Sequence, residues 1–127
     1  MNDPGPPVAL AGTVNRRGEA LVELKVAGPA GQEALTCLID TGFTGTLVIP
    51  EAVAQRLRLP RRGSTVATLA DGSEALFRRY EAVIDWPSGR RRVWALATAS
   101  ADALVGVGLL RRHRLLIDYP ARMVKVS

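Results

Sequence analysis

An acidic residue between two short apolar runs constrains the fold of this chain more than any other feature. Residues 35–39 read Leu-Thr-Cys-Leu-Ile, Asp40-Thr41-Gly42 follow at once, and residues 47–49 read Leu-Val-Ile. A carboxylate rarely follows such a run without a reason, because an unpaired buried charge is unfavourable. Gly42 lets the backbone turn sharply. The pattern predicts a carboxylate held at the end of a rigid strand. For the triplet alone, a plain turn between two strands is the alternative, because Asp and Gly both favour turns.

Length and composition predict one globular domain. The chain has 127 residues, of which 47% are hydrophobic and 23% charged, a balance that argues against disorder. We expect a flexible N-terminal tail over residues 1–11, since residues 1–7 hold three prolines. A single domain is expected over residues 12–127. The most apolar window, residues 93–110, contains Asp102 and is a poor bilayer span, so no membrane association is expected.

The single cysteine argues for a reducing compartment. Cys37 has no partner for an intrachain disulfide, and the N-terminus lacks a charged start followed by an apolar core. We therefore expect a cytoplasmic protein. Cys37 and the lone His113 form a conceivable nucleophile and base, but a thiol inside an apolar run is better interpreted as a core residue. No His/Cys cluster has metal-ligand spacing, so neither a metal nor another cofactor is expected.

The basic charge raises the question of nucleic acid. The net charge is +5, and because Lys25 and Lys125 are the only lysines among 17 basic residues, 15 are arginines. They are scattered as pairs and one triplet, and aromatic residues make up only 5% of the chain. Single-strand binding needs more stacking rings than that. The sequence therefore argues against a nucleic-acid partner. Nucleic-acid binding remains an alternative to the two functions considered below.

Periodicity predicts a mainly β fold with one or two short helices. Apolar and charged residues alternate near the start of the chain, Gly/Pro clusters separate the apolar runs, and Pro50 and Pro60 bracket a helical pattern. Asp71-Gly72 between extended runs predicts a hairpin. The expected strands are 20–26, 33–39, 47–49, 65–69, 75–84, 93–97, 103–106, 115–118 and 123–126, with helices after Pro50 and over 109–113.

Acid–base hydrolysis of an amide needs two carboxylates, and this chain offers one such site. One group takes a proton from water and the other gives a proton to the carbonyl oxygen. Asp118, which also follows an apolar run, leads into Tyr119-Pro120 and is better interpreted as capping a strand end. A two-fold symmetric dimer would supply the second copy of Asp40.

The order of these elements resembles the retropepsin-type aspartic proteases. Within them, residues 40–45, Asp-Thr-Gly-Phe-Thr-Gly, look most like a group of small bacterial and archaeal predicted proteases. The resemblance covers roughly residues 12–126 and implies a closed β-barrel that forms one half of an acid protease. It implies that Asp40 is the catalytic aspartate, that Thr41 joins a hydrogen-bonded lattice between two active-site turns, and that Gly42 lies against the bound peptide.

The same resemblance assigns further parts of the chain. Ala70, Asp71, Gly72 and Ser73 would be the tip of a flap that closes over substrate. Leu104-Val105-Gly106, with Leu109-Leu110 behind them, would brace the active-site loop. The terminal strands would help to form the dimer sheet.

Two departures from the viral members stand out. Phe43 occupies a position where those members commonly carry Ala, which is expected to narrow the cleft. Val107 stands where they usually have an Arg that pairs with an acid after the catalytic triplet, and Thr44-Gly45-Thr46 lacks that acid.

The sequence thus predicts a homodimeric aspartic endopeptidase that hydrolyses extended peptides or proteins through a water activated by Asp40 from each subunit. The alternative is a protease-like module for dimerisation or peptide binding with little or no turnover, because a fold does not establish an activity.

Overall fold

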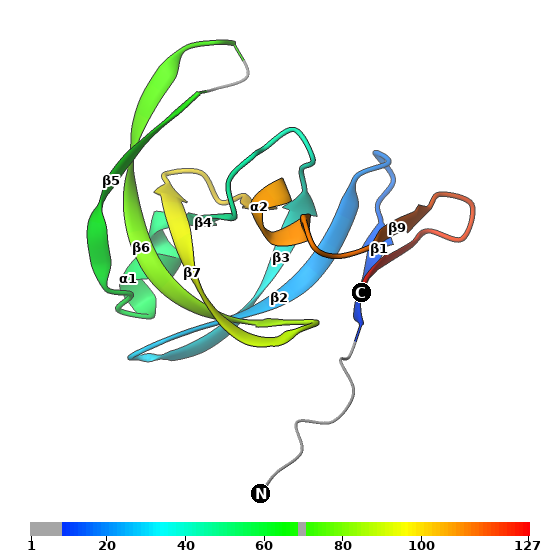
Figure 1. Cartoon of the computed structure of the whole chain (residues 1–127), viewed down its shortest axis with the longest axis horizontal. Coiled ribbons are helices and arrows are strands. Elements are labelled where there is room, and N and C mark those ends of the chain that lie inside the picture. The colour runs from blue at the N-terminus through cyan, green and yellow to red at the C-terminus, as the bar shows by residue number, and fades with distance from the viewer. Residues whose placement is uncertain (1–8, 69–70) are drawn as a thin grey trace, which may run out of the picture.

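The computed structural model describes residues 9–68 and 71–127. Strands dominate these residues, with two short helices between them (Figure 1). In chain order the elements are β1 (Leu10–Val14), β2 (Ala20–Gly28), β3 (Gly31–Ile39), β4 (Leu47–Pro50), α1 (Glu51–Arg56), β5 (Arg61–Thr68), β6 (Glu74–Trp86), β7 (Gly89–Thr98), β8 (Ala103–Val105), α2 (Val107–Leu110), β9 (Leu115–Asp118) and β10 (Met123–Val126).

All the strands belong to one sheet, and part of that sheet closes on itself. The order is β5-β6-β7-β4-β8-β3-β2-β1-β10-β9, with an additional pairing between β6 and β2. That pairing, Val26 opposite Ile84, completes a closed barrel of six strands. Strand β8 lies between β3 and β4, parallel to the first and antiparallel to the second. The sequence prediction of a mainly β closed barrel with short helices is confirmed.

Alternation of side chains along the strands builds the core. In β2, Val22, Leu24 and Val26 are buried, whereas the residues between them face outward. Strand β6 has 13 residues and serves two purposes: its second half is barrel wall with buried Tyr80 and Ile84, and its first half pairs with β5 in a projecting hairpin. In Figure 1 this hairpin rises beyond the barrel. The core therefore ends where the hairpin begins.

The two ends of the chain pair with each other at one edge of this sheet, and we call this part, formed by β1, β10 and β9, the terminal sheet. β1 pairs with both β2 and β10, and β10 pairs with β9, which is the last strand in the order. Leu10 and Ala11, which the sequence assigned to the tail, belong to β1. Sequence patterning missed this strand because Gly12 interrupts it. A Cβ at Gly12 would overlap the carbonyl oxygen of Leu21, so glycine permits the close approach of β2.

Other element boundaries differ modestly from the prediction. Helix α1 ends at Arg56, where Glu33 of β3 binds the Arg56 guanidinium at 2.9 Å. The helix expected over 109–113 instead covers Val107–Leu110, so Arg111–His113 lie in the turn after it. Over residues 9–68 and 71–127, no helix has the length and apolar character needed to cross a membrane.

The buried thiol gives a simple test of the core. Cys37 is fully buried, and burial raises its pKa from 9.0 to about 12. At pH 8 the native protein should therefore hold about a thousandfold less thiolate than the unfolded chain. We expect iodoacetamide to leave Cys37 unmodified in native buffer and to alkylate it rapidly in denaturant, as measured by mass spectrometry. Rapid labelling under native conditions would contradict this core.

Candidate active site

Asp40 lies immediately beyond the end of β3, where the sequence placed it. Its backbone amide donates a hydrogen bond of 2.9 Å to the carbonyl oxygen of Val105, the last residue of β8. Its carboxylate Oδ1 accepts a 3.0 Å hydrogen bond from the amide of Gly42. The residue is half-buried. The backbone of Asp40 is thus fixed to a neighbouring strand, while the carboxylate stays accessible.

The loop after Asp40 is hydrogen-bonded to the junction between β8 and α2. Because β8 lies between β3 and β4, this loop must cross the end of β8 to connect them. Backbone hydrogen bonds tie the crossing together: Asp40 N to Val105 O, 2.9 Å; Gly106 N to Thr46 O, 2.9 Å; Val107 N to Phe43 O, 2.8 Å; and Gly108 N to Gly45 O, 2.9 Å. The loop has no regular secondary structure, but these hydrogen bonds hold its backbone in place.

The residues that follow Asp40 differ in exposure. Thr41 and Gly42 are exposed, and a Cβ at Gly42 would lie 3.3 Å from Asp40 Oδ1. The Phe43 ring instead folds back onto Gly45 and Gly106. The ring therefore packs against its own loop and the end of β8, rather than simply narrowing the cleft as the sequence suggested.

The segment expected to brace the loop lies directly beside it. Val105 is fully buried, and Leu104 is paired with Leu38 of β3, two residues before Asp40. Leu109 and Leu110 of α2 are buried behind it. The structure therefore places Val105 and Gly106 in contact with the predicted catalytic loop, and Leu104 between the two strands that the loop connects.

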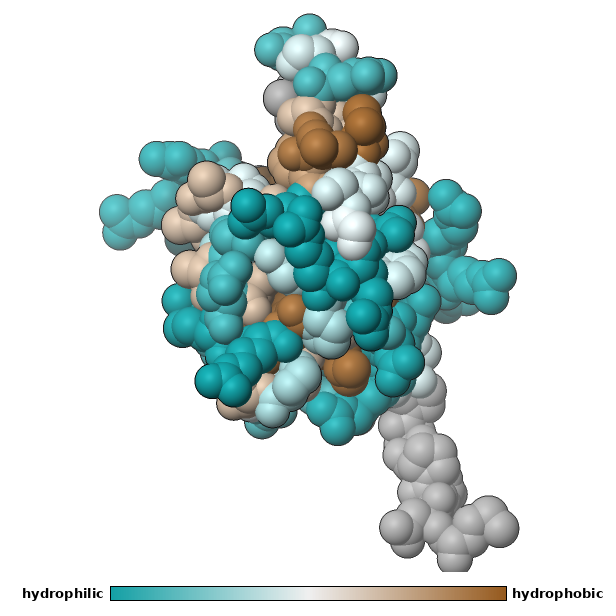
Figure 2. Space-filling view, turned by 90° about the vertical axis from the view of Figure 1, so that its left-hand side faces the viewer, coloured by the Kyte–Doolittle hydropathy of each residue, from teal (hydrophilic) through white to brown (hydrophobic). Residues whose placement is uncertain are grey.

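The projecting hairpin carries part of the predicted flap. Ala70 lies outside the described residues, whereas Asp71, Gly72 and Ser73 form the turn that leads into β6. Asp71 Oδ1 accepts a 2.9 Å hydrogen bond from the Ser73 amide. Farther down, Val66 and Leu76 face each other across the two strands and are 58% and 71% exposed. Figure 2 shows hydrophobic residues on this projection, below a hydrophilic tip.

A cleft of about 390 Å³ lies along β2, β3 and β8. Its apolar lining includes Leu21, Leu38 and Leu104 from β2, β3 and β8, and its polar lining includes Arg17 and Asp102. Asp40 is not among the lining residues, so the cleft lies along the strands that precede the carboxylate rather than around it.

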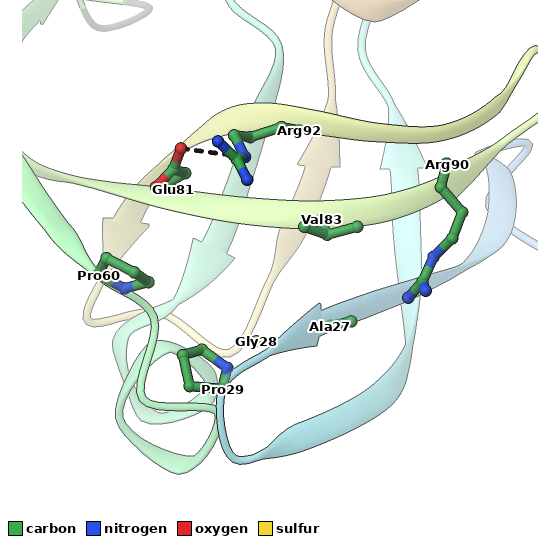
Figure 3. Close-up of a pocket in the computed structure, with 8 residues that line it drawn as sticks. All are labelled: Ala27, Gly28, Pro29, Pro60, Glu81, Val83, Arg90 and Arg92. Carbon is green, nitrogen blue, oxygen red and sulfur yellow. Dashed lines mark ion pairs between the residues drawn. The ribbon is translucent and has the colours of Figure 1, made fainter.

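A second cleft, of about 410 Å³, lies elsewhere. Gly28 and Pro29 line it, so it sits at the β2–β3 turn, at the far end of β3 from Asp40. Figure 3 shows Arg90 extending from β7 toward Ala27, and Arg92 paired with Glu81 at 3.2 Å. This cleft therefore lies away from Asp40.

Sequence reasoning missed a polar cluster at the root of the hairpin. Glu51 Oε1, in the first turn of α1, accepts hydrogen bonds from the Tyr80 hydroxyl at 2.6 Å, from Gln55 at 3.1 Å and from Arg78 at 3.2 Å. Partial burial opposes ionisation of Glu51, but these donors outweigh it and hold its pKa below the ordinary value. From the sequence, only the contact with Gln55 could have been expected, because Gln55 lies one helical turn from Glu51. Tyr80 and Arg78 come from a distant strand.

The thiol and the histidine are not a catalytic pair. Cys37 is buried with its Sγ 3.7 Å from the Leu35 carbonyl oxygen, while the His113 ring packs edge-on against Trp86 at 5.5 Å. The core interpretation of Cys37 is confirmed. Across the described part of the chain, no group of three or more His, Cys, Asp or Glu side chains is arranged to hold a metal.

Comparison with solved structures identifies the fold. The chain superposes on a retropepsin-like aspartic protease from Rickettsia conorii with a TM-score of 0.63 and 15% sequence identity, covering 94% of this chain and 89% of the other. A protease from simian foamy virus matches with a TM-score of 0.49 and 16% identity, over 70% of this chain and 91% of the viral one. The fold is retropepsin-like, and the Rickettsia conorii neighbour is an aspartic protease. No protein-family model and no curated protein matches the sequence.

The Glu51 cluster predicts a pH-dependent contribution to stability. Because the pKa of Glu51 is lowered on folding, its stabilising effect is present above its unfolded value of 4.5 and is lost as pH falls through the folded value. We expect Glu51→Gln to lower the Tm by a few degrees at pH 7 and by progressively less below pH 4.5. The matched control, Glu23→Gln on the exposed face of β2, should leave the Tm nearly unchanged. A Glu51→Gln deficit of constant size down to pH 3 would contradict this account.

Proposed function

We propose that this protein is a homodimeric aspartic endopeptidase in which Asp40 of each subunit activates the hydrolytic water. The observation that carries the proposal is the placement of Asp40: it directly follows the end of β3, its backbone is fixed to β8, and its carboxylate is accessible. The retropepsin-like fold supports the same conclusion. We further infer a cytoplasmic location from the single buried cysteine.

A single subunit holds one of the two acids that this chemistry needs. Asp102 lines the cleft along β2, β3 and β8, but it precedes β8, whereas Asp40 is bonded to the residue that ends that strand. Ala103 pairs with Cys37, so Asp102 lies near the level of Thr36, about 13 Å along the strand from Asp40 at about 3.3 Å per residue. The second acid in the proposal is therefore Asp40 of the partner subunit.

The mechanism follows from two carboxylates that meet across a symmetry axis. At a separation of a few ångströms they share one proton, because ionising both is unfavourable. The charged carboxylate would take a proton from water, and the neutral one would donate a proton to the carbonyl oxygen of the scissile peptide bond.

Thr41 is exposed beside Asp40 and would bond to the partner loop. Gly42 leaves room for the peptide backbone, and the β5–β6 hairpin, with Asp71, Gly72 and Ser73 at its turn, would close over it as a flap.

The terminal sheet provides a surface for the second subunit. Among the strands that the structure describes, β9 pairs with β10 alone, which leaves its other edge as a candidate for pairing with a second copy. Leu116 and Met123, from β9 and β10, are 54% and 53% exposed. An unpaired strand edge beside exposed apolar side chains is the type of surface that a second copy would cover.

Removing the carboxylate tests the chemistry. Asp40→Asn keeps the size of the side chain but cannot take a proton from water, so we expect peptide cleavage to fall by about a thousandfold or more. The assay is digestion of a peptide library at acidic and neutral pH, followed by mass spectrometry. Asp85→Asn, which alters only an exposed pair with Arg90, should cleave like the native protein. Equal cleavage by the Asp40 variant would exclude the proposal, and peptide binding without products would favour the inactive binding module.

A charge on the terminal sheet tests the dimer. Leu116→Lys should shift the protein toward monomer in sedimentation velocity and lower specific activity most at low protein concentration, because a buried lysine opposes association. Trp94→Lys alters an exposed apolar side chain on β7 and should leave the sedimentation unchanged. If Leu116→Lys dimerises like the native chain, β9 does not form the interface.

A further inference from the structure

The Phe43 ring occupies a site that two glycines leave open. A Cβ at Gly45 would overlap the Phe43 ring at Cζ and lie 2.8 Å from Cε1. A Cβ at Gly106 would lie 2.5 Å from Cδ2 of the same ring. The ring is thus held between its own loop and the end of β8, two segments far apart in sequence. Together, Gly45 and Gly106 form a seat for the ring, which we call the glycine seat.

Backbone conformation does not account for Gly45. Neither Gly45 nor Gly106 has a positive φ, and Gly106 has φ −103°. Gly106 is also constrained by nearby backbone, since its Cβ would lie 2.7 Å from the Phe43 carbonyl oxygen. At Gly45, by contrast, the three atoms nearest the absent Cβ all belong to the Phe43 ring. Gly45 is therefore the residue whose missing side chain reports most directly on the ring.

The glycine seat lies at the junction that holds the carboxylate. Gly106 directly follows Val105, whose carbonyl oxygen accepts the Asp40 amide. The carbonyl oxygen of Phe43 itself accepts the amide of Val107. The ring and the backbone hydrogen bonds therefore restrain the same crossing point from two sides.

We propose that Phe43 is a positioning residue, whose ring, seated on Gly45 and Gly106, fixes the loop that carries Asp40. This inference rests on the proposed function for its catalytic consequence only. Val107 and Thr44 cannot form an ion pair that would hold the loop. Packing of the ring takes the place of such a pair. Displacing it would leave the hydrogen-bonded crossing intact on average but more mobile, and a carboxylate misplaced by about 1 Å lowers turnover substantially.

A double-mutant cycle distinguishes a specific seat from general apolar packing. The variants are Phe43→Ala, Gly45→Ala and the combination of both. The three atoms nearest the methyl group of Gly45→Ala all belong to the ring, so the substitution should be harmful in the native background and nearly neutral once the ring is gone. Phe43→Tyr keeps the ring and should restore native behaviour. Trp94→Ala, which removes an exposed ring from β7, is the control for loss of a ring as such.

Two measurements are made on each variant. Amide hydrogen exchange at Val107 and Gly108, the donors to the loop, should accelerate about tenfold in Phe43→Ala and in Gly45→Ala, and no further in the double variant. For peptide cleavage, kcat should fall about tenfold or more with KM changed less than about twofold, because the substitutions misplace the acid without removing binding contacts. Phe43→Leu, which retains apolar volume, supplies the same comparison should Phe43→Ala not fold.

The outcomes separate this inference from the proposed function. Unchanged exchange at Val107 and Gly108 in Phe43→Ala would overturn it, as would equal harm from Gly45→Ala with and without the ring. If exchange responds as expected while the native protein cleaves no peptide, the positioning role stands and the protease proposal fails.

Discussion

The passage of one loop over the end of one short strand governs the architecture of the site. Strands β3 and β4 follow each other in sequence, yet β8 lies between them in the sheet. The connection between β3 and β4 must therefore cross β8 where that strand ends, and backbone meets backbone at the crossing. A Cβ at Gly106 would overlap the carbonyl oxygen of Gly45, and one at Gly108 would lie 2.9 Å from it. Small residues at this point are a consequence of topology.

This crossing also explains why a half-exposed acid can be held firmly. The loop has no regular secondary structure, but its backbone groups bond to residues 105–108, which the buried side chains of Val105, Leu109 and Leu110 anchor in the core. The position of Asp40 is thus set by packing on the far side of the crossing, while its carboxylate remains accessible. Rigidity comes from the barrel, while the side chain stays free to contact solvent or a bound group.

Much of this arrangement could be predicted from the sequence because its signals are local. The apolar run before Asp40, the Asp71-Gly72 turn and the prolines around α1 each indicate structure within a few residues. Strand β1 and the Glu51–Tyr80 contact could not be predicted, because they depend on pairings between segments distant in sequence. The packing of the Phe43 ring could be predicted only in part. Its contact with Gly45 is local in sequence, but its contact with Gly106 exists only because β8 enters the sheet beside β3.

The apolar seat of Phe43 bears on how two subunits would come together. An ion pair that fixed the loop would depend on salt and on its burial, whereas a ring packed on glycines lies within one subunit and needs no partner. Each loop would then be ordered before association. The dimer interface in the proposed enzyme would need only to align two preformed loops, without the entropic penalty of ordering them. A terminal sheet that is already paired within the chain, through β1 with β10 and β10 with β9, fits the same pattern: both the loop and the edge are assembled in the monomer. Association would therefore contribute the second carboxylate and little further folding.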